Sequence, residues 1–359
     1  MKSKKQILCL VALTASACAT GEVPKLSQIE ALPALPAPVA NNAVASLVVD
    51  NEQIVFSFAG LAAGREHDDV LDKTWVYRDS VGDWQEAAPV PGGVGRLAAV
   101  AAGVNGLAYV FGGYTVAADG SEVSTPWVHT FDPETGVFSE RATMPVPVDD
   151  AVAVVYQDRY IYLISGWHDL GNVNLVQRYD TETDTWVQAT PTPGPGVFGH
   201  AGGIFDGQIV YCDGVAIEPH PDKRRDFAAI DNCYRGIIDE DDGRRIDWRT
   251  LPPHPGLPRY RMAAAGSTGM HGVLFIGGSA NPYNYNGTGY DGQPSEPETG
   301  ALLFDFMTGE WRVIETTGVA TMDHRGLVLI DGKPTTIGGM RDGQSVIGES
   351  YSYSLAPPR

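Results

Sequence analysis

A short apolar run that ends in glycine recurs six times along the 359-residue chain. Apolar runs of this length, bounded by a turn-forming residue, predict β-strands. The final glycines lie roughly 50 to 65 residues apart, a period that indicates a repeated unit of several strands. The runs are residues 54–60, 107–113, 160–166, 208–214, 273–278 and 334–339.

Pairs of aromatic residues mark a second feature of the same units. In four units a second aromatic residue follows the first after seven positions, with a turn-rich tetrad such as 133–136 between them. This predicts two strands joined by a tight turn, each with a ring that packs. In the fourth unit we expect Tyr234 and Trp248 to pair across the polar insert 239–245. The other pairs are Tyr77/Trp84, Phe131/Phe138, Tyr179/Trp186 and Phe304/Trp311.

Six such units predict an all-β, six-bladed β-propeller, which we place at residues 31–355. The last unit ends soon after Gly339 and has no late tryptophan. Residues 32–36 resemble the segments that follow the other outer strands, such as 88–91. We therefore expect an N-terminal strand to complete the sixth blade and close the ring, so that no sheet edge stays exposed.

The glycine-ended strands and aromatic pairs resemble the kelch-repeat family over about residues 30–355. In such a propeller the connections between second and third strands emerge on one face, and here they are long. Long loops on a rigid scaffold commonly carry binding sites, so we expect the ligand site on this face. We expect the loop 279–300, rich in Asn, Gly and Tyr, to form a mobile rim or lid. The long connections are 61–74, 114–127, 215–231, 279–300 and 340–349.

The net charge limits the partners of the protein, and the N-terminus indicates where in the cell it is located. A formal charge of −19 argues against nucleic acid or an anionic membrane surface as a partner. Residues 1–17 have the basic start and short apolar stretch of a signal peptide. Cys18 follows in a lipobox-like context, so we expect lipidation, a tether at 18–30 and export to the periplasm or outer membrane. Plain cleavage, without a lipid, is the alternative.

The cysteines predict a disulfide and no metal site. Cys212 and Cys233 flank one loop, and in an oxidising compartment they would bridge neighbouring strands. No recurring spacing of ligand residues defines a metal, and no cofactor is expected.

Polar residues precede the innermost strands, where a propeller surrounds its axis. Each is followed by small or apolar residues that suit a crowded channel. We expect them to form a polar pocket at the mouth of the channel. They are Asn42, Arg96, Asp149 or Asp150, His200, Arg261 and His324.

The unit count, the leader and the arginines resemble the bacterial N-acetylneuraminate epimerases, which are sugar mutarotases. The resemblance implies an isomerase of a small, acidic sugar whose proton acceptor is a glutamate in the loop after the fourth glycine-ended strand. Glu218 is the best match, although Val215 directly follows Gly214, where that family has its glutamate. His200 or His324 would act as the acid. The arginines expected to hold the sugar carboxylate are Arg96, Arg224, Arg225 and Arg261.

Three other readings stay open. The first is a noncatalytic lipoprotein that binds carbohydrate or protein. The second is a copper radical oxidase, because galactose oxidase also has kelch blades, but Cys212 and Cys233 look paired with each other. The third is a polysaccharide lyase or sialidase, although the repeated Ser-x-Asp-x-Gly-x-x-Trp signature of sialidases does not occur.

Overall fold

The chain forms six groups of four antiparallel strands in a computed structural model that describes residues 25–223 and 225–355. The first strands of successive groups contact one another around a ring, which makes them the innermost strands. The six-bladed β-propeller predicted from the repeats is confirmed. Residues 1–17, Cys18 and Arg224 lie outside the described residues, as do the predictions made on them.

The first three blades have the strand order of the sequence, from the axis outward. Blade one comprises β2 (Ala43–Val49), β3 (Glu52–Leu61), β4 (Val70–Arg78) and β5 (Asp83–Glu86). Blade two comprises β6 (Val100–Val104), β7 (Leu107–Phe111), β10 (Val128–Asp132) and β11 (Val137–Glu140). Blade three comprises β12 (Val152–Tyr156), β13 (Tyr160–Ile164), β16 (Val176–Asp180) and β17 (Thr185–Gln188).

The other three blades follow the same plan, with one change in the last. Blade four comprises β18 (Ala201–Phe205), β19 (Gln208–Cys212), β22 (Cys233–Ile238) and β23 (Ile246–Leu251). Blade five comprises β24 (Ala263–Ser267), β25 (Gly272–Ile276), β26 (Ala301–Asp305) and β27 (Glu310–Thr317). Blade six comprises β28 (Val328–Ile330), β29 (Lys333–Ile337), β32 (Ser350–Leu355) and the N-terminal β1 (Lys25–Leu32).

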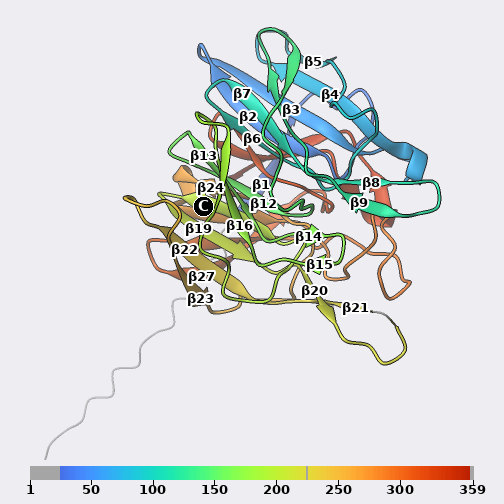
Figure 1. Cartoon of the computed structure of the whole chain (residues 1–359), viewed down its shortest axis with the longest axis vertical. Helices are drawn as coiled ribbons and strands as arrows, with labels where there is room; N and C mark the ends of the chain where they lie inside the picture. Colours follow the sequence, from blue (N-terminus) through green and yellow to red (C-terminus); the bar gives the residue numbers. More distant parts are fainter. Residues whose placement is uncertain (1–24, 224, 356–359) are drawn as a thin grey trace, which may run out of the picture.

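Small hairpins fill most connections between second and third strands. Three of them, β8–β9, β14–β15 and β20–β21, lie on the same side of the molecule, to the right in Figure 1. The expected long connection in blade one is shorter, because β4 already begins at Val70 and only 62–69 remain. The elements are β8 (Tyr114–Val116), β9 (Glu122–Ser124), β14 (Trp167–His168), β15 (Gly171–Asn172), β20 (Val215–Glu218), β21 (Asp226–Ala229), β30 (Met340–Arg341), β31 (Ser345–Val346) and the 3₁₀ turns η1 (His67–Asp69), η2 (Thr268–Met270) and η3 (Asp342–Gln344). None of the described helices is long or apolar enough to cross a membrane.

Strand β1 closes the ring, as expected. It pairs antiparallel with β32 and also meets β27 of blade five in parallel, so blades five and six form one continuous sheet. Leu26 is fully buried in the core between these blades, beside Ile314 and Tyr353. The strand begins at Lys25, so the segment 25–30, expected to be part of a tether, is an integral part of the propeller.

The aromatic pairs lie directly opposite each other on the outer two strands of their blades. For example, Tyr179 faces Trp186 with ring centroids 4.9 Å apart. Blade four differs from the prediction, because Trp248 faces Gly236 rather than Tyr234. A side chain on Gly236 would collide with the Trp248 ring, so the ring takes the space that the glycine leaves. The longer turn shifts the register by two residues and breaks the expected pairing.

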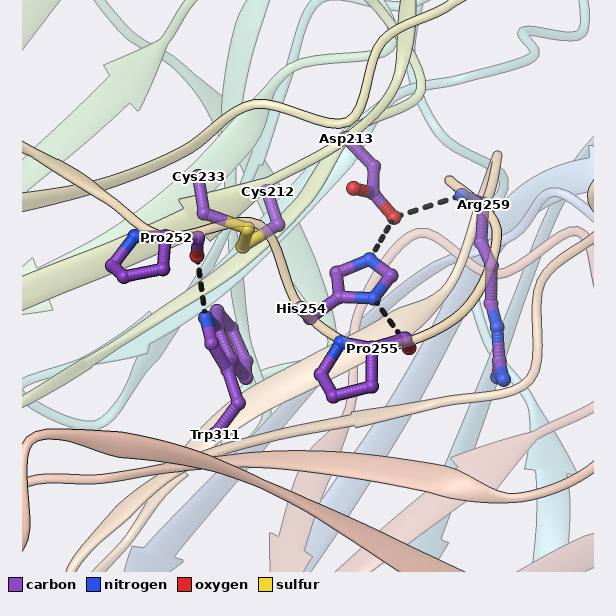
Figure 2. The surroundings of a disulfide bond; sticks show 8 residues. All are labelled: Cys212, Asp213, Cys233, Pro252, His254, Pro255, Arg259 and Trp311. Atoms are coloured by element: carbon purple, nitrogen blue, oxygen red, sulfur yellow. Dashed lines mark hydrogen bonds and ion pairs between the residues drawn. A yellow bond between two sulfur atoms is a disulfide. The ribbon is translucent and has the colours of Figure 1, made fainter.

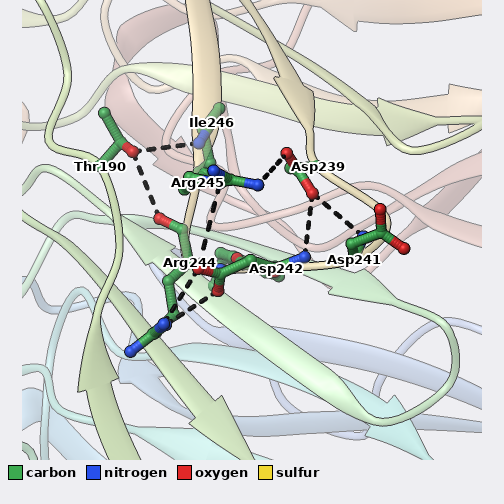
Figure 3. A network of polar contacts seen from close by, with 9 residues as sticks. Thr190, Asp239, Asp241, Asp242, Arg244, Arg245 and Ile246 are labelled. Carbon is green, nitrogen blue, oxygen red and sulfur yellow. Dashed lines mark hydrogen bonds and ion pairs between the residues drawn. The ribbon is translucent and has the colours of Figure 1, made fainter.

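The polar insert 239–245 is a folded turn that joins blade four to the end of blade three (Figure 3). Oδ1 of Asp239 accepts hydrogen bonds from the backbone N–H groups of Asp241 and Asp242. Thr190 of blade three donates its N–H to the carbonyl of Arg244, and its hydroxyl accepts from Ile246. The insert therefore has a structural role between neighbouring blades.

Cys212 and Cys233 form a disulfide between two paired strands of blade four (Figure 2). The next residue, Asp213, is buried and accepts hydrogen bonds from Nε2 of His254 and the N–H of Arg259, each at 2.8 Å. His254 also contacts the carbonyl of Pro255 through Nδ1. The disulfide and this buried pair together fix the segment that leads into blade five.

Hydrogen bonds donated by backbone N–H groups link all six blades in a closed circle at the axis. Each connection into an innermost strand has, at the same position, a residue with φ between 50° and 65°. The N–H at this position donates to the preceding blade, to a carbonyl in four cases and to the Asn41 side chain in the case of Ala98. In blade six the neighbouring His324 donates instead, to Arg261. The six residues are Asn41, Ala98, Asp150, Gly199, Arg261 and Asp323.

We expect Leu26→Ala to lower the free energy of unfolding by about 2–5 kcal/mol, because it leaves a cavity at the seam that closes the ring. Ile29→Ala, on the same strand but half exposed, is the matched control and should change it by less than about 0.5 kcal/mol. Denaturant unfolding measures both. Equal effects would show that β1 does not support the ring in this way.

Replacing both cysteines, as Cys212→Ala with Cys233→Ala, should cost about 3 kcal/mol in unfolding free energy. The bridge closes a loop of 21 residues. Without it the unfolded chain gains conformational entropy that corresponds to about this free energy. Unfolding of the oxidised wild type and the double variant under identical conditions tests this. An unchanged midpoint would contradict it.

Candidate functional site

A cavity of about 120 Å³ opens at the axis, on the face that bears the hairpins. Hairpins β8–β9, β14–β15 and β20–β21 supply its walls, and the connections at the axis supply its floor. Its lining combines carboxylates and arginines with six aromatic rings. The rings are those of Tyr114, Trp167, Phe198, Phe227 and Tyr285, with Tyr290 a sixth at the same wall.

Paired charges lie at and beneath the floor of this cavity, where Asp150 and Arg261 are part of the lining. Arg261 donates from Nε and Nη2 to the two oxygens of Asp150, at 3.2 and 2.7 Å, and from Nη1 to Asp323 at 2.9 Å. Arg325 forms a second ion pair with Asp150. The side chains of these four residues are at most 3% exposed. Their charges cancel, and such a desolvated cluster holds its shape because breaking one pair leaves a buried charge unpaired.

Two adjacent carboxyl groups on this floor differ in their protonation. Burial and the neighbouring Asp150 charge raise the pKa of Asp149 well above its usual value. The hydroxyl of Ser124, which donates to Oδ2 of Asp149 at 2.6 Å, lowers this pKa but does not outweigh the other two effects. Burial alone would also raise the pKa of Asp150, but Arg261 and Arg325 hold it below the usual value. Asp149 therefore keeps its proton to a higher pH than Asp150 does, which makes Asp149 the better proton donor and Asp150 the more readily ionised partner.

Glu122 and Arg225 stand at the wall of the cavity. The Glu122 side chain is open to solvent within the cavity, but the surrounding protein desolvates it and raises its pKa. The guanidinium of Arg225 lies 4.5 Å from the Trp167 ring centroid and 5.6 Å from that of Phe227. Arg225 forms no ion pair with a carboxylate among the residues that the structure describes. It is thus a cation held by aromatic rings and open to an anionic ligand.

The loop 279–300 covers the cavity from blade five. Its Tyr290 ring packs 4.4 Å from Phe227, and Tyr283 is fully buried against Tyr260 at the axis. Nη1 of Arg65 in blade one donates to the Asn286 carbonyl at 2.6 Å, across the face of the ring. These contacts tie the loop, which was expected to be a mobile rim or lid, to blades one and four and to the axis.

The structure brings together only some of the residues predicted for the site. Asp149, Asp150, Arg225 and Arg261 all line the cavity. Arg261 is engaged by two carboxylates, so its predicted role as a clamp for a ligand is replaced by a structural one.

Both predicted histidine acids lie elsewhere. His200 and His324 line a separate cavity of about 80 Å³, along the channel and away from the cavity on the hairpin face. Burial lowers the pKa of His200 to about 4 and that of His324 to about 3, which leaves both neutral at physiological pH. Asn42 is buried and donates to the hydroxyl of Ser57. Arg261 is at the axial position itself, whereas Asn42, His200 and His324 each come one residue after it. Their side chains therefore face a different space.

Glu218, the predicted base, points away from the cavity. It is exposed and pairs with Asp226 across the β20–β21 hairpin, whereas the preceding Ile217 pairs with Phe227. Paired residues share a face and successive residues alternate, so Glu218 lies on the face opposite the cavity-lining Phe227. Arg225, two positions before Phe227, is on the cavity side.

The sequence interpretation missed Glu122, Ser124 and Arg325. The alternation in Glu122-Val123-Ser124 was the available signal, because it places both polar side chains on one face of a strand. Arg325 had no such signal. Among the described residues, no group of three or more His, Cys, Asp or Glu side chains is arranged to hold a metal ion.

Arg261→Met should destabilise the protein by about 3–5 kcal/mol at pH 7, because Asp150 and Asp323 lose a buried partner. Asp150 has a lowered pKa in the folded state, so its contribution is present above the ordinary carboxyl pKa and is lost as pH falls through the lower, folded value. The difference between variant and wild type should therefore shrink below pH 4. Arg249→Met removes an exposed ion pair and should cost less than about 1 kcal/mol. A pH-independent difference in urea unfolding would contradict this account of the floor.

Comparison with known proteins agrees with this architecture. A family model described as "Kelch motif" matches residues 95–145 and 151–193. The N-acetylneuraminate epimerase of Salmonella typhimurium is 25% identical over 354 residues, which cover 87% of this chain and 86% of that protein. Kelch-like protein 15 of Danio rerio is 22% identical over 238 residues, 66% of this chain and 37% of that protein. A solved structure titled "Structure of YjhT" superimposes with a TM-score of 0.69 at 17% identity, over 91% of this chain and 99% of that one. The chain is therefore a six-bladed β-propeller with kelch motifs in its second and third blades and with sequence similarity to the bacterial N-acetylneuraminate epimerases.

Proposed function

We propose that the cavity on the hairpin face binds a small acidic sugar and catalyses the exchange of its anomers. The observation that carries this proposal is a pair of carboxyl groups in a cavity walled by aromatic rings: the buried Asp149, whose pKa is strongly raised, and the solvent-accessible Glu122. The similarity to proteins named N-acetylneuraminate epimerase supports the same reaction class.

Arg225 would hold the carboxylate of the sugar. Its guanidinium is fixed against Trp167 and Phe227 and can present two parallel N–H donors to a carboxylate. The aromatic side chains that line the cavity would cover the apolar C–H faces of the sugar ring. Binding would thus orient the anomeric carbon toward the two carboxyl groups.

The two carboxyl groups fit the proton transfers of ring opening. Glu122 would take the proton of the anomeric hydroxyl while Asp149 gives its proton to the ring oxygen; the bond between ring oxygen and anomeric carbon breaks and the carbonyl forms. After the carbonyl turns, the protons return by the reverse path and the ring closes. Ser124 contacts Asp149, and Glu122 is two positions earlier on the same strand face, roughly 7 Å along the strand from Ser124, so both acids face the same cavity.

A noncatalytic sugar-binding protein is the second candidate. Val215 is fully buried and occupies the position where the resemblance places the proton acceptor. If the catalytic acid and base have been lost rather than moved to blades two and three, the cavity would still bind sugar without accelerating anomer exchange.

We further propose that the protein is exported. The disulfide between Cys212 and Cys233 supports an oxidising compartment, where such bonds persist. The basic and apolar N-terminal residues agree with a leader, and Cys18 with a lipid anchor. Mass spectrometry of the mature N-terminus from the native host would decide between a lipidated Cys18 and plain cleavage.

Anomer exchange of freshly dissolved α-N-acetylneuraminate, followed by NMR, should be accelerated by the wild type. Glu122→Gln and Asp149→Asn should each slow the catalysed exchange by about 10²- to 10⁴-fold, the usual contribution of a general acid or base. The rate should fall at high pH as Asp149 loses its proton and at low pH as Glu122 gains one.

Glu218→Gln is the matched control, because Glu218 is exposed and faces away from the cavity. Its rate should equal that of the wild type. Loss of exchange in Glu218→Gln, with normal rates in the other two variants, would contradict the assignment. No acceleration by any form, together with saturable thermal stabilisation by the sugar, would establish the noncatalytic candidate.

A further inference from the structure

A buried arginine lies outside the axial site without a carboxylate partner. Arg96 is 1% exposed and forms no ion pair with any carboxylate in the described part of the chain. Burial lowers the pKa of Arg96 to about 10, so the guanidinium still has its charge at neutral pH. A desolvated charge of this kind is unfavourable unless other groups compensate it.

The contacts of Arg96 fix the protonation of a neighbouring histidine. Its Nη1 donates to the carbonyl of Gly112 at 2.9 Å, and its Nη2 lies 3.3 Å from Nδ1 of His129. Because a guanidinium only donates, Nδ1 of His129 must accept. Burial and Arg96 lower the pKa of His129 to about 4, so its imidazole is neutral and has its proton on Nε2.

That Nε2–H group faces open space. His129 is 96% buried, yet it lines a cavity of about 370 Å³ between blades one and two, together with Trp127, Glu140 and Arg141. Nε2 makes no hydrogen bond with the described residues. It is also not one of the polar atoms that are fully shielded from solvent, so it is accessible from this cavity. The positive charge of Arg96 behind the ring polarises this N–H toward an acceptor.

The repeat itself shows that the fold does not require this histidine. Arg259 occupies the position of Arg96 in the connection before blade five and donates to the carbonyls of Gly277, Gly300 and Thr299. Leu302 stands there in the place of His129, as the matching strand registers show. An arginine at this position thus does not require a histidine beside it, and in blade five the charges of Glu298 and Asp213 act on Arg259 instead. His129 is therefore particular to blade two, where it adds a donor that points outward.

We propose that this cavity is a second ligand site, which binds an oxyanion such as a carboxylate or a sulfate group. The Nε2–H of His129 donates to the anion, and the charge of Arg96 behind it strengthens that bond. Arg141 lies in the lining and supplies a second positive charge. The site is separate from the axial cavity and does not depend on the function proposed for it.

Glu140 lowers the affinity of this second site for an anion. It lies directly opposite His129 on the neighbouring strand and is exposed at the edge of the cavity. Its carboxylate competes for the same N–H and repels a bound anion. Removal of one like charge at close range in water should strengthen binding about fivefold.

Titration with sodium acetate, and separately with sodium sulfate, against sodium chloride at constant ionic strength tests the site. The side-chain ¹⁵N–¹H signal of His129 should show the Nε2–H tautomer and shift saturably with at least one of the two anions. The stronger ligand identifies the group as carboxylate or sulfate. Glu140→Gln should bind about fivefold more tightly.

His129→Leu, which copies the residue of blade five, is the matched variant and should lose the saturable response. Its circular dichroism spectrum and its unfolding midpoint in denaturant report that the fold is intact. Three results would each overturn the proposal: a wild type without a saturable shift, a His129 proton on Nδ1, or unchanged anion binding by His129→Leu. If His129→Leu does not fold, the tautomer of the wild type and the affinity of Glu140→Gln still decide.

Discussion

The closed circle of hydrogen bonds at the axis is the constraint on which the site depends. Six successive blades meet through residues at one repeat position, and all six have a positive φ. Five of these residues are not glycine, and a left-handed conformation costs a side-chain-bearing residue of order 1–3 kcal/mol. The backbone accepts this cost because each such turn directs an N–H at the neighbouring blade. Any displacement of one blade would therefore break a bond to the next.

The same turns decide which space each side chain faces. Residues at the circle itself, such as Asp150 and Arg261, form the charged floor of the cavity on the hairpin face. Residues one position later, such as His200 and His324, face the inner channel. Arg96, two positions before Ala98, lies in the wall between blades. A single connection of the chain thus supplies three separate environments, and the charge balance of each follows from its own residues.

The repeat made the architecture predictable from the sequence, but the site was only partly so. Glycine-ended strands and the aromatic pairs recur because every blade packs in the same way, and they led to the correct ring and its closing strand. The axial position has no common residue type, as Ala98, Gly199 and Arg261 illustrate, so its register could not be read from one chain. An error of one or two positions there moved Arg96, His200 and His324 into a pocket that they do not line. Glu218 was misplaced for the same reason, since one step along a strand reverses the face.

The central claim is that the cavity on the hairpin face binds a sugar through groups from blades two, three and four. A crystal structure of the protein with N-acetylneuraminate tests it most directly. The account predicts density for the sugar above Asp149, with its carboxylate on Arg225 and its anomeric hydroxyl near Glu122. A sugar bound elsewhere on the propeller, with the cavity on the hairpin face holding only water at saturating concentration, would contradict it.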